Sequence, residues 1–575
     1  MTSETSAARA PGVADRAALA VAVFFLLLWA RALFAGAGAD AGWAGSAGYR
    51  GDADLWLEQV LASRAGVLFE AGVPLRPPGM PWLVDQLWDG TAEGIAGLKA
   101  WWRVMGAGAG ALLFLALARP FGLGVALTAA ALFGLSNASL HVSSSINVES
   151  PYQLVAVGSM LALPFGGRWS PGHAALFGLL SAAACLLRAE HLVIALLLGT
   201  WAAARRGERS PLGAGAAALA FIAALAPAHL ALWEDVRRFN DGEHPTPEAT
   251  EAAFERIERR TGRMVWSDEA RAAFDALPAF ARRSSSLFVA DTVRHRGRSE
   301  VMAADIAILD EAFGARPAPL APRPFVSSSG PLNLWLANGP GASSSFGRGA
   351  LMAPPPLEGG AERYPAELVA GLPPERLSLE YVPHLDVFNN GVSCTLAHVA
   401  SGPATWAGLG AAKLAHAWRG ASAGLGGHGL PAGGSGTRRP VDLVVNDGLL
   451  GTLWSLAVLA AAISGLVLAR REKALTPWVL LLFGRLALAA VFYGYARQGA
   501  LALPAVSLLV ALALARLAAP RLGRRAIPLG LGLVALLLLL ELLRAHSGVE
   551  IAVDGAAVGP TPPVDAAVEA AIRYD

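Results

Sequence analysis

Long apolar runs, separated by short polar stretches, dominate the pattern of the chain. A helix that crosses a membrane needs about 20 mostly apolar residues. The pattern therefore predicts an all-α, polytopic membrane protein, a bundle of about eleven transmembrane helices. Their approximate ranges are 17–38, 99–118, 120–140, 149–166, 172–187, 189–204, 212–233, 446–469, 475–494, 499–518 and 526–544.

Two longer polar segments interrupt this series and divide the chain. We expect an N-terminal transmembrane module with an outer loop, an extracytoplasmic insertion, a group of C-terminal helices and a short extracytoplasmic tail. These parts cover 1–233 with its loop at 39–98, then 234–445, 446–545 and 546–575.

The polar segments carry helical signals of their own. "DLWLEQVLASRAGVLF" (54–69) has apolar residues at helical spacing and predicts an amphipathic helix at the membrane interface. In the insertion, 267–283 predicts a helix with Ser267 as its N-cap. The Pro-, Gly- and Ser-rich stretch 315–360 predicts a loop, and 424–440 a flexible linker.

Composition and charge agree with this class. Hydrophobic residues make up 54% of the 575 residues and charged residues 16%, and the net charge of +2 argues against nucleic-acid binding. Lys and Arg gather in alternate short loops, such as "RRGER" (205–209) and "RREK" (470–473). By the positive-inside rule the N-terminus is cytoplasmic, and the insertion and the C-terminus face outside.

Carboxylates follow the first apolar run, in "GYRGDADLWLEQ" (48–59). Asp52 lies at the start of the predicted interfacial helix, with Asp54 two residues on. A carboxylate there can cap the helix and interact with its dipole. It can also act as a general base that takes a proton from a hydroxyl group.

Cations on the outer side are candidates for binding an anion such as phosphate. Arg76 precedes a rigid Pro-Pro-Gly turn, Arg188 follows an apolar run, and Arg497 opens a predicted span. Glu149 lies at the outer end of another span, where capping and a functional role are both open. Snorkelling to lipid headgroups is the alternative for Arg76 and Arg497.

Several of these motifs, in this order, resemble GT-C-type glycosyltransferases that use lipid-linked sugars. These are the bacterial relatives of protein O-mannosyltransferases and of the lipid A aminoarabinose transferase. "GDADLWLEQVLASRAGVLFEAGVPLRPPGMPWLV" (51–84) is similar to the first outer loop of that family. Asp52 falls on its catalytic acidic position and Arg76 on its basic position, while Trp56 replaces a Tyr.

Later segments extend the resemblance to about residue 510. "GLLSAAACLLRAEHL" (178–192) places Arg188 on the basic position of a family motif. "GPLNLWLANGPGASSSF" (330–346) looks like an outer loop that carries Asn338, and "YARQGALALPAVSLL" (494–508) resembles a late motif, weakened to Arg497.

The resemblance implies an inverting glycosyltransferase on the outer face of the bacterial inner membrane. Its donor is a sugar on a polyprenyl phosphate, and its acceptor is a hydroxyl group of a glycan, lipid or protein. Asp52 acts as the base with Asp54 beside it, the arginines Arg76, Arg188 and Arg497 bind the donor phosphate, and the substrate contacts are Glu149, Trp56 and Asn338. Some relatives use a divalent metal. We expect no essential metal or other cofactor here, with His141 and Glu149 as the pair to watch.

Two other classes of protein remain open at this point. A transporter or flippase for a lipid-linked or anionic substrate would use the same outer arginines, although such proteins often show internal repeats. A non-catalytic assembly or sensor protein would use the insertion at 234–445 to bind a partner.

Overall fold

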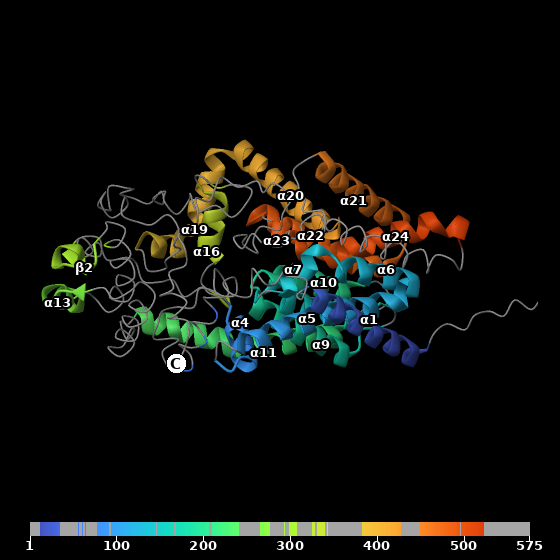
Figure 1. Ribbon diagram of the computed structural model, residues 1–575, viewed down its shortest axis with the longest axis horizontal. Coiled ribbons are helices and arrows are strands. Elements are labelled where there is room, and N and C mark those ends of the chain that lie inside the picture. Colours follow the sequence, from blue (N-terminus) through green and yellow to red (C-terminus); the bar gives the residue numbers. More distant parts are fainter. Residues whose placement is uncertain are drawn as a thin grey trace, which may run out of the picture.

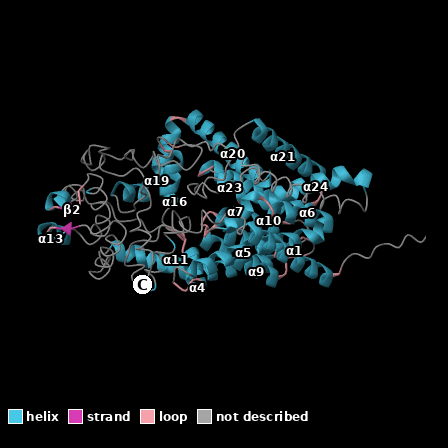
Figure 2. Cartoon of the chain, viewed as in Figure 1, coloured by secondary structure: helices cyan, strands magenta, loops and turns pink. Residues whose placement is uncertain are grey.

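The computed structural model is mainly helical (Figure 1; Figure 2). It describes residues 12–34, 56, 60, 64, 77–90, 94–144, 146–165, 168–205, 210–240, 265–276, 293, 298–307, 325–327, 330–339, 342, 382–426, 449–494 and 496–522. Asp52, Asp54 and Arg76 lie outside these residues, as do the predicted span 526–544 and the tail.

Within the described residues, four helices are long and apolar enough to cross a membrane. They are α1 (Val13–Phe34), α5 (Gly94–Phe121), α11 (Pro211–Asn240) and α22 (Thr476–Val491), the last with the short 3₁₀ turn Lys473–Leu475 before it. A fifth span results if α6 (Leu123–Gly134) and α7 (Asn137–Ser144), which are bent by 62°, cross as one.

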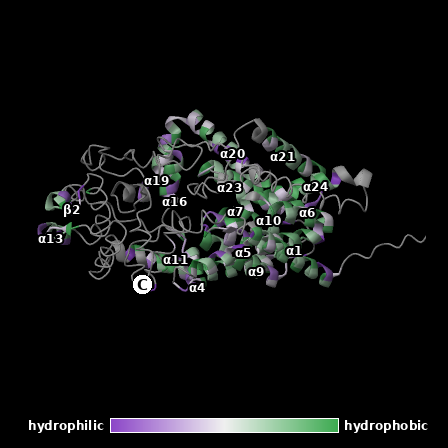
Figure 3. Cartoon of the chain, in the orientation of Figure 1, coloured by the Kyte–Doolittle hydropathy of each residue, from purple (hydrophilic) through white to green (hydrophobic). Residues whose placement is uncertain are grey.

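The outer surfaces of α1 and α11 indicate a membrane environment. In the apolar 18-residue stretch of each helix, only 11% of α1 and 17% of α11 is buried inside the protein. Figure 3 shows the hydrophobic residues along these helices. Because exposed apolar surface on this scale is unfavourable in water, these helices fit a multi-pass membrane protein.

Ten of the eleven predicted segments contain a helix, but the prediction of eleven spans is not shown. The remaining helices of the bundle do not qualify as spans by length and composition over the residues that the structure fully describes. They are α8 (Glu149–Leu161), α9 (Pro171–Leu187), α10 (His191–Ala204), α21 (Leu449–Leu468), α23 (Ala496–Ala500) and α24 (Leu503–Leu522).

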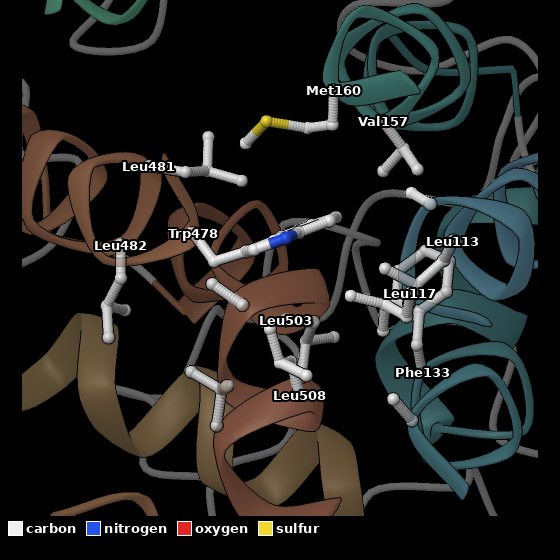
Figure 4. Close-up of a cluster of buried hydrophobic side chains, with 14 of the residues drawn as sticks. Leu113, Leu117, Phe133, Val157, Met160, Trp478, Leu481, Leu482, Leu503 and Leu508 are labelled. Atoms are coloured by element: carbon white, nitrogen blue, oxygen red, sulfur yellow. The ribbon is translucent and has the colours of Figure 1, made fainter. Parts of the chain in front are cut away.

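A large apolar core joins the N-terminal helices to the C-terminal ones. Trp478 of α22 is buried at its centre, and Figure 4 shows its ring among side chains from several helices. Val157 and Met160 come from α8, and Leu503 and Leu508 from α24. The described N-terminal and C-terminal helices therefore form one bundle.

Small residues allow helices of the bundle to approach closely. A Cβ added at Gly178 of α9 would collide with the backbone carbonyl of Ala217 in α11. This agrees with the role of glycine at helix contacts in membranes.

A second apolar cluster lies beside α4 (Gly79–Leu87). Trp56 and Val60 are helical, lie four residues apart and are buried in it, so these two apolar positions of the predicted helix 54–69 pack against protein. Arg64, a further four residues on, donates from Nε to Oδ1 of Asp85 in α4 at 2.7 Å. Trp56 and Val60 thus attach the segment 39–98 to the bundle, and the Arg64–Asp85 contact lies within that segment.

The insertion differs in part from its prediction. Helix α13 (Asp268–Ala276) begins as expected, because Ser267 Oγ accepts from the Ala270 N–H at 3.1 Å. Two short strands, β1 (Val265–Trp266) and β2 (Glu300–Val301), pair in parallel and were not predicted (Figure 2). Strands of two residues are too short to show an alternating pattern in the sequence.

The prediction of a loop over 315–360 is wrong at 330–338. This stretch forms helix α16 (Gly330–Asn338), which buries Leu332, Trp335 and Leu336. Their spacing is helical, but the surrounding Gly, Pro and Ser residues obscured it. Helix α16 packs against α19 (Val382–Ser401), which precedes α20 (Pro403–Gly426).

Candidate functional site

Charged side chains from three helix ends meet inside the bundle. Arg188, the residue directly after α9, donates from Nη1 to Oε1 of Glu149, the first residue of α8, at 2.9 Å. Its Nε donates to Oε1 of Glu190 at 2.6 Å. The Glu149 side chain is fully buried, so this is an interior ion pair rather than a surface one.

The chain turns sharply at this point. Helix α9 ends because Arg188 adopts an extended backbone conformation, and Glu190 precedes the first residue of α10. The ranges 172–187 and 189–204 accordingly form two separate helices. Glu149 directly follows Val148, the N-cap residue of α8, and its carboxylate forms the ion pair with Arg188.

A fourth charge reaches the same place from the C-terminal part of the chain. Arg485 of α22 lies with Nη1 3.6 Å from Oε1 of Glu190, and its guanidinium carbon is 4.4 Å from the centre of the Tyr152 ring. We call Glu149, Arg188, Glu190 and Arg485 the four-charge cluster. Its formal charges balance, which reduces the cost of burying them.

Tyr152 connects this cluster to a buried histidine. Its hydroxyl group lies 2.6 Å from Nδ1 of His191, and both side chains are almost completely buried. His191 therefore packs and hydrogen-bonds in the core. A cation such as Arg485 is favoured over the negative face of an aromatic ring, by about 2 kcal/mol when desolvated.

The described neighbours of the predicted base and of Arg76 pack next to this cluster. Trp56, four residues after Asp52, and Met80, four after Arg76, share the second apolar cluster with Tyr152. A Cβ added at Gly79 would lie 2.5 Å from the carbonyl oxygen of Leu186, two residues before Arg188.

Asn338 belongs to a separate polar group. Its Nδ2 donates to the carbonyl oxygens of Leu334 and Val491, at 2.8 and 2.7 Å. Its Oδ1 accepts from Trp406 Nε1 at 3.0 Å and from Lys413 Nζ at 2.9 Å. Both donors and both acceptor positions of the amide are thus used within the protein, and Asn338 joins α16, α20 and α22.

Two other predicted residues lie in described helices without described side chains. Arg497 is in α23, and His141 is in α7. Among the side chains that the structure describes, no group of three His, Cys, Asp or Glu residues could hold a metal ion.

The site residues predicted from the sequence did not include Arg485, Tyr152 and Lys413. The signal for Arg485 was available, because it is a lone cation inside the predicted span 475–494, and such residues are often functional. Lys413 is fully buried yet lies in a stretch of mixed composition, so the apolar pattern did not distinguish it.

The fold and this site define a mainly helical, multi-pass membrane protein with a buried cluster of charges. No protein-family model, curated protein or solved structure matches the chain.

Proposed function

We propose that this protein is a membrane glycosyltransferase that transfers a sugar from a polyprenyl-phosphate donor to a hydroxyl acceptor. The proposal includes the GT-C-like bundle of eleven spans, with the reaction on the outer face of a bacterial inner membrane. The motif order supports it, as does the buried cluster of arginines and carboxylates.

The observation that carries the proposal is the convergence of three separate sequence motifs. The flank of Asp52 (Trp56) and the flank of Arg76 (Met80) pack with Tyr152, whose ring lies against Arg485. Arg188, from the third motif, shares Glu190 with Arg485. This is the arrangement expected if a base and phosphate-binding cations serve one reaction.

In the proposed mechanism, Asp52 takes the proton of the acceptor hydroxyl group as its oxygen attacks the anomeric carbon of the sugar. The bond from that carbon to the lipid phosphate breaks, and the single displacement inverts the configuration. Negative charge grows on the leaving phosphate, where the arginines stabilise it most. Arg76, Arg188 and Arg497 are the proposed phosphate ligands, and Glu149, Trp56 and Asn338 contribute to substrate binding or to its support.

Mass spectrometry of envelope glycans, glycolipids and glycoproteins, with and without the gene, tests this function and identifies the acceptor. We expect one class of product to lose a sugar when the gene is deleted and to regain it on complementation. Unchanged products in all three fractions would contradict the proposal.

Arg485 favours one alternative, a transporter for a lipid-linked or anionic substrate. It lies within the candidate span Lys473–Val491, and ionisable residues in spans often mark substrate pathways. Protein reconstituted in vesicles separates the two functions. A transporter moves the substrate across the bilayer without forming a glycosidic bond, whereas the proposed enzyme forms that bond.

A further inference from the structure

Arg485 is a buried cation with poor hydrogen bonding. Its side chain is 2% exposed, and within the part of the chain that the structure describes none of its Nε, Nη1 and Nη2 atoms makes a hydrogen bond. The contact with Glu190 at 3.6 Å is too long for one. A guanidinium group has five N–H donors, and leaving them unsatisfied in the interior is costly. The Arg485 guanidinium group can therefore donate hydrogen bonds to a further group that carries acceptor oxygens.

Glu190 occupies the position from which an anion would contact both arginines. Among the described residues it is the carboxylate within 4 Å of both, with Oε1 2.6 Å from Arg188 Nε and 3.6 Å from Arg485 Nη1. One carboxylate oxygen cannot satisfy two guanidinium groups at once. A phosphate group offers more acceptor oxygens, in a geometry that suits arginine.

Glu190 is also the member of the four-charge cluster that is placed to move. Its side chain is 27% exposed, against 10% for Arg188, 2% for Arg485 and none for Glu149. It precedes α10 but makes no capping bond to that helix, so among the described residues turning away breaks its contacts to the two arginines.

We propose that the carboxylate of Glu190 holds the place of a phosphate group between Arg188 and Arg485, and that a phosphate ligand binds by displacing it. The choice of phosphate rests on the proposed function, and the phosphate can be that of a lipid or free phosphate. The phosphate oxygens then accept hydrogen bonds from the guanidinium group of Arg485.

Binding to the purified full-length protein in nanodiscs tests this proposal. The probes are a polyprenyl phosphate, the matching polyprenol without phosphate, and inorganic phosphate as a competitor. Glu190→Gln removes the competing charge and keeps the shape of the side chain. It should tighten binding of the polyprenyl phosphate by about tenfold, within the usual range of coupling between sites, and leave polyprenol binding unchanged.

Arg485→Gln should weaken binding of the polyprenyl phosphate by about tenfold or more and should remove the gain from Glu190→Gln in the double variant. If Arg485→Gln does not give a single size-exclusion peak, Arg485→Lys replaces it in the experiment. This variant keeps the positive charge but loses the planar set of N–H donors that binds phosphate. Glu472→Gln is the matched control, because Glu472 is half exposed and pairs with Arg516 elsewhere.

Unchanged or weaker binding in Glu190→Gln would overturn the proposal, and so would a gain that persists in the double variant. If inorganic phosphate competes with the polyprenyl phosphate, the site binds free phosphate. If it does not compete, the site is specific for the lipid headgroup. Because binding is read without turnover, failure here leaves the glycosyltransferase proposal standing. Loss of sugar transfer alone would in turn leave this site standing.

Discussion

At the scale of single residues, the buried ion pair of Arg188 and Glu149 should contribute to the stability of the protein. Glu149→Gln removes one charge without changing the size of the side chain. Loss of one partner of a buried pair costs about 3–5 kcal/mol, because the other charge is left without full compensation. We expect a matching drop in stability in denaturant unfolding of the detergent-solubilised protein.

The control for this change is Glu234→Gln. Glu234 pairs with Arg237 one turn away at 2.6 Å, but both side chains are about half exposed. Exposed pairs contribute little, so this variant should stay within about 0.5 kcal/mol of the unmodified protein. Equal effects of the two variants would contradict the interior role of Glu149.

Lys413 gives a residue-scale prediction for pH. Burial lowers the pKa of Lys413 to about 8, below the ordinary lysine value of 10.5. Between these two values the unfolded chain binds more protons than the folded one, so the free energy of unfolding rises with pH in this window. Lys413→Met should abolish this contribution. The difference in stability between the two proteins should therefore shift in favour of the unmodified protein from pH 7 to pH 9.5, and a constant difference would contradict it.

The residues of the site were predictable to different degrees. Arg188 stood out because it interrupts an apolar run on the side where basic residues are scarce. Arg485 stood inside an apolar run too, but its partners, Glu190 and Tyr152, are about 300 residues away in the sequence. Only the packing of α22 against α10 makes that relation visible.

At the scale of elements, the contact between α4 and the end of α9 positions the first outer loop. Gly79→Ala would bring a methyl group within 2.5 Å of the Leu186 carbonyl oxygen, and backbone atoms on both sides must then shift. Overpacking of this kind costs about 1–3 kcal/mol. We expect reduced stability. We also expect weaker donor binding, because Arg188, a proposed ligand of the donor phosphate, lies two residues after Leu186.

Gly97→Ala is the control for this substitution. Gly97 lies in α5, and an added Cβ would meet nothing within 4 Å. Replacing a helical glycine by alanine at such a position should stabilise the protein by about 0.5–1 kcal/mol. Neutral behaviour of Gly79→Ala beside a stabilised Gly97→Ala would contradict the close contact of α4 with α9.

The positions of the bundle helices could be predicted from the apolar pattern of the sequence. The exceptions have physical reasons. Helices of the bundle bury apolar side chains over many turns, so their signal accumulates along the sequence. Helix α16 has nine residues between stretches rich in Gly, Pro and Ser, and α20 extends to Gly426, into the predicted linker 424–440. In such short or glycine-rich stretches, tertiary packing decides the structure more than local pattern does.

At the scale of the whole molecule, orientation in the membrane is open to a direct test. Alkaline phosphatase is active only after export, so its fusion after Ala276 should be active, and its fusion after Arg471 should be inactive. The basic loop at 470–473 is the reason, because such loops stay in the cytoplasm. The reverse activities would contradict the orientation that places the proposed reaction outside.

The most direct test of the central claim is sugar transfer by the purified protein. A polyprenyl-phosphate sugar is supplied with an envelope extract, and the transferred sugar is measured for the unmodified protein and for Asp52→Asn. The account predicts transfer by the unmodified protein and a loss of at least about 100-fold in Asp52→Asn, the usual contribution of a general base, at equal protein yield and stability. No transfer by the unmodified protein, or equal transfer by both, would contradict it.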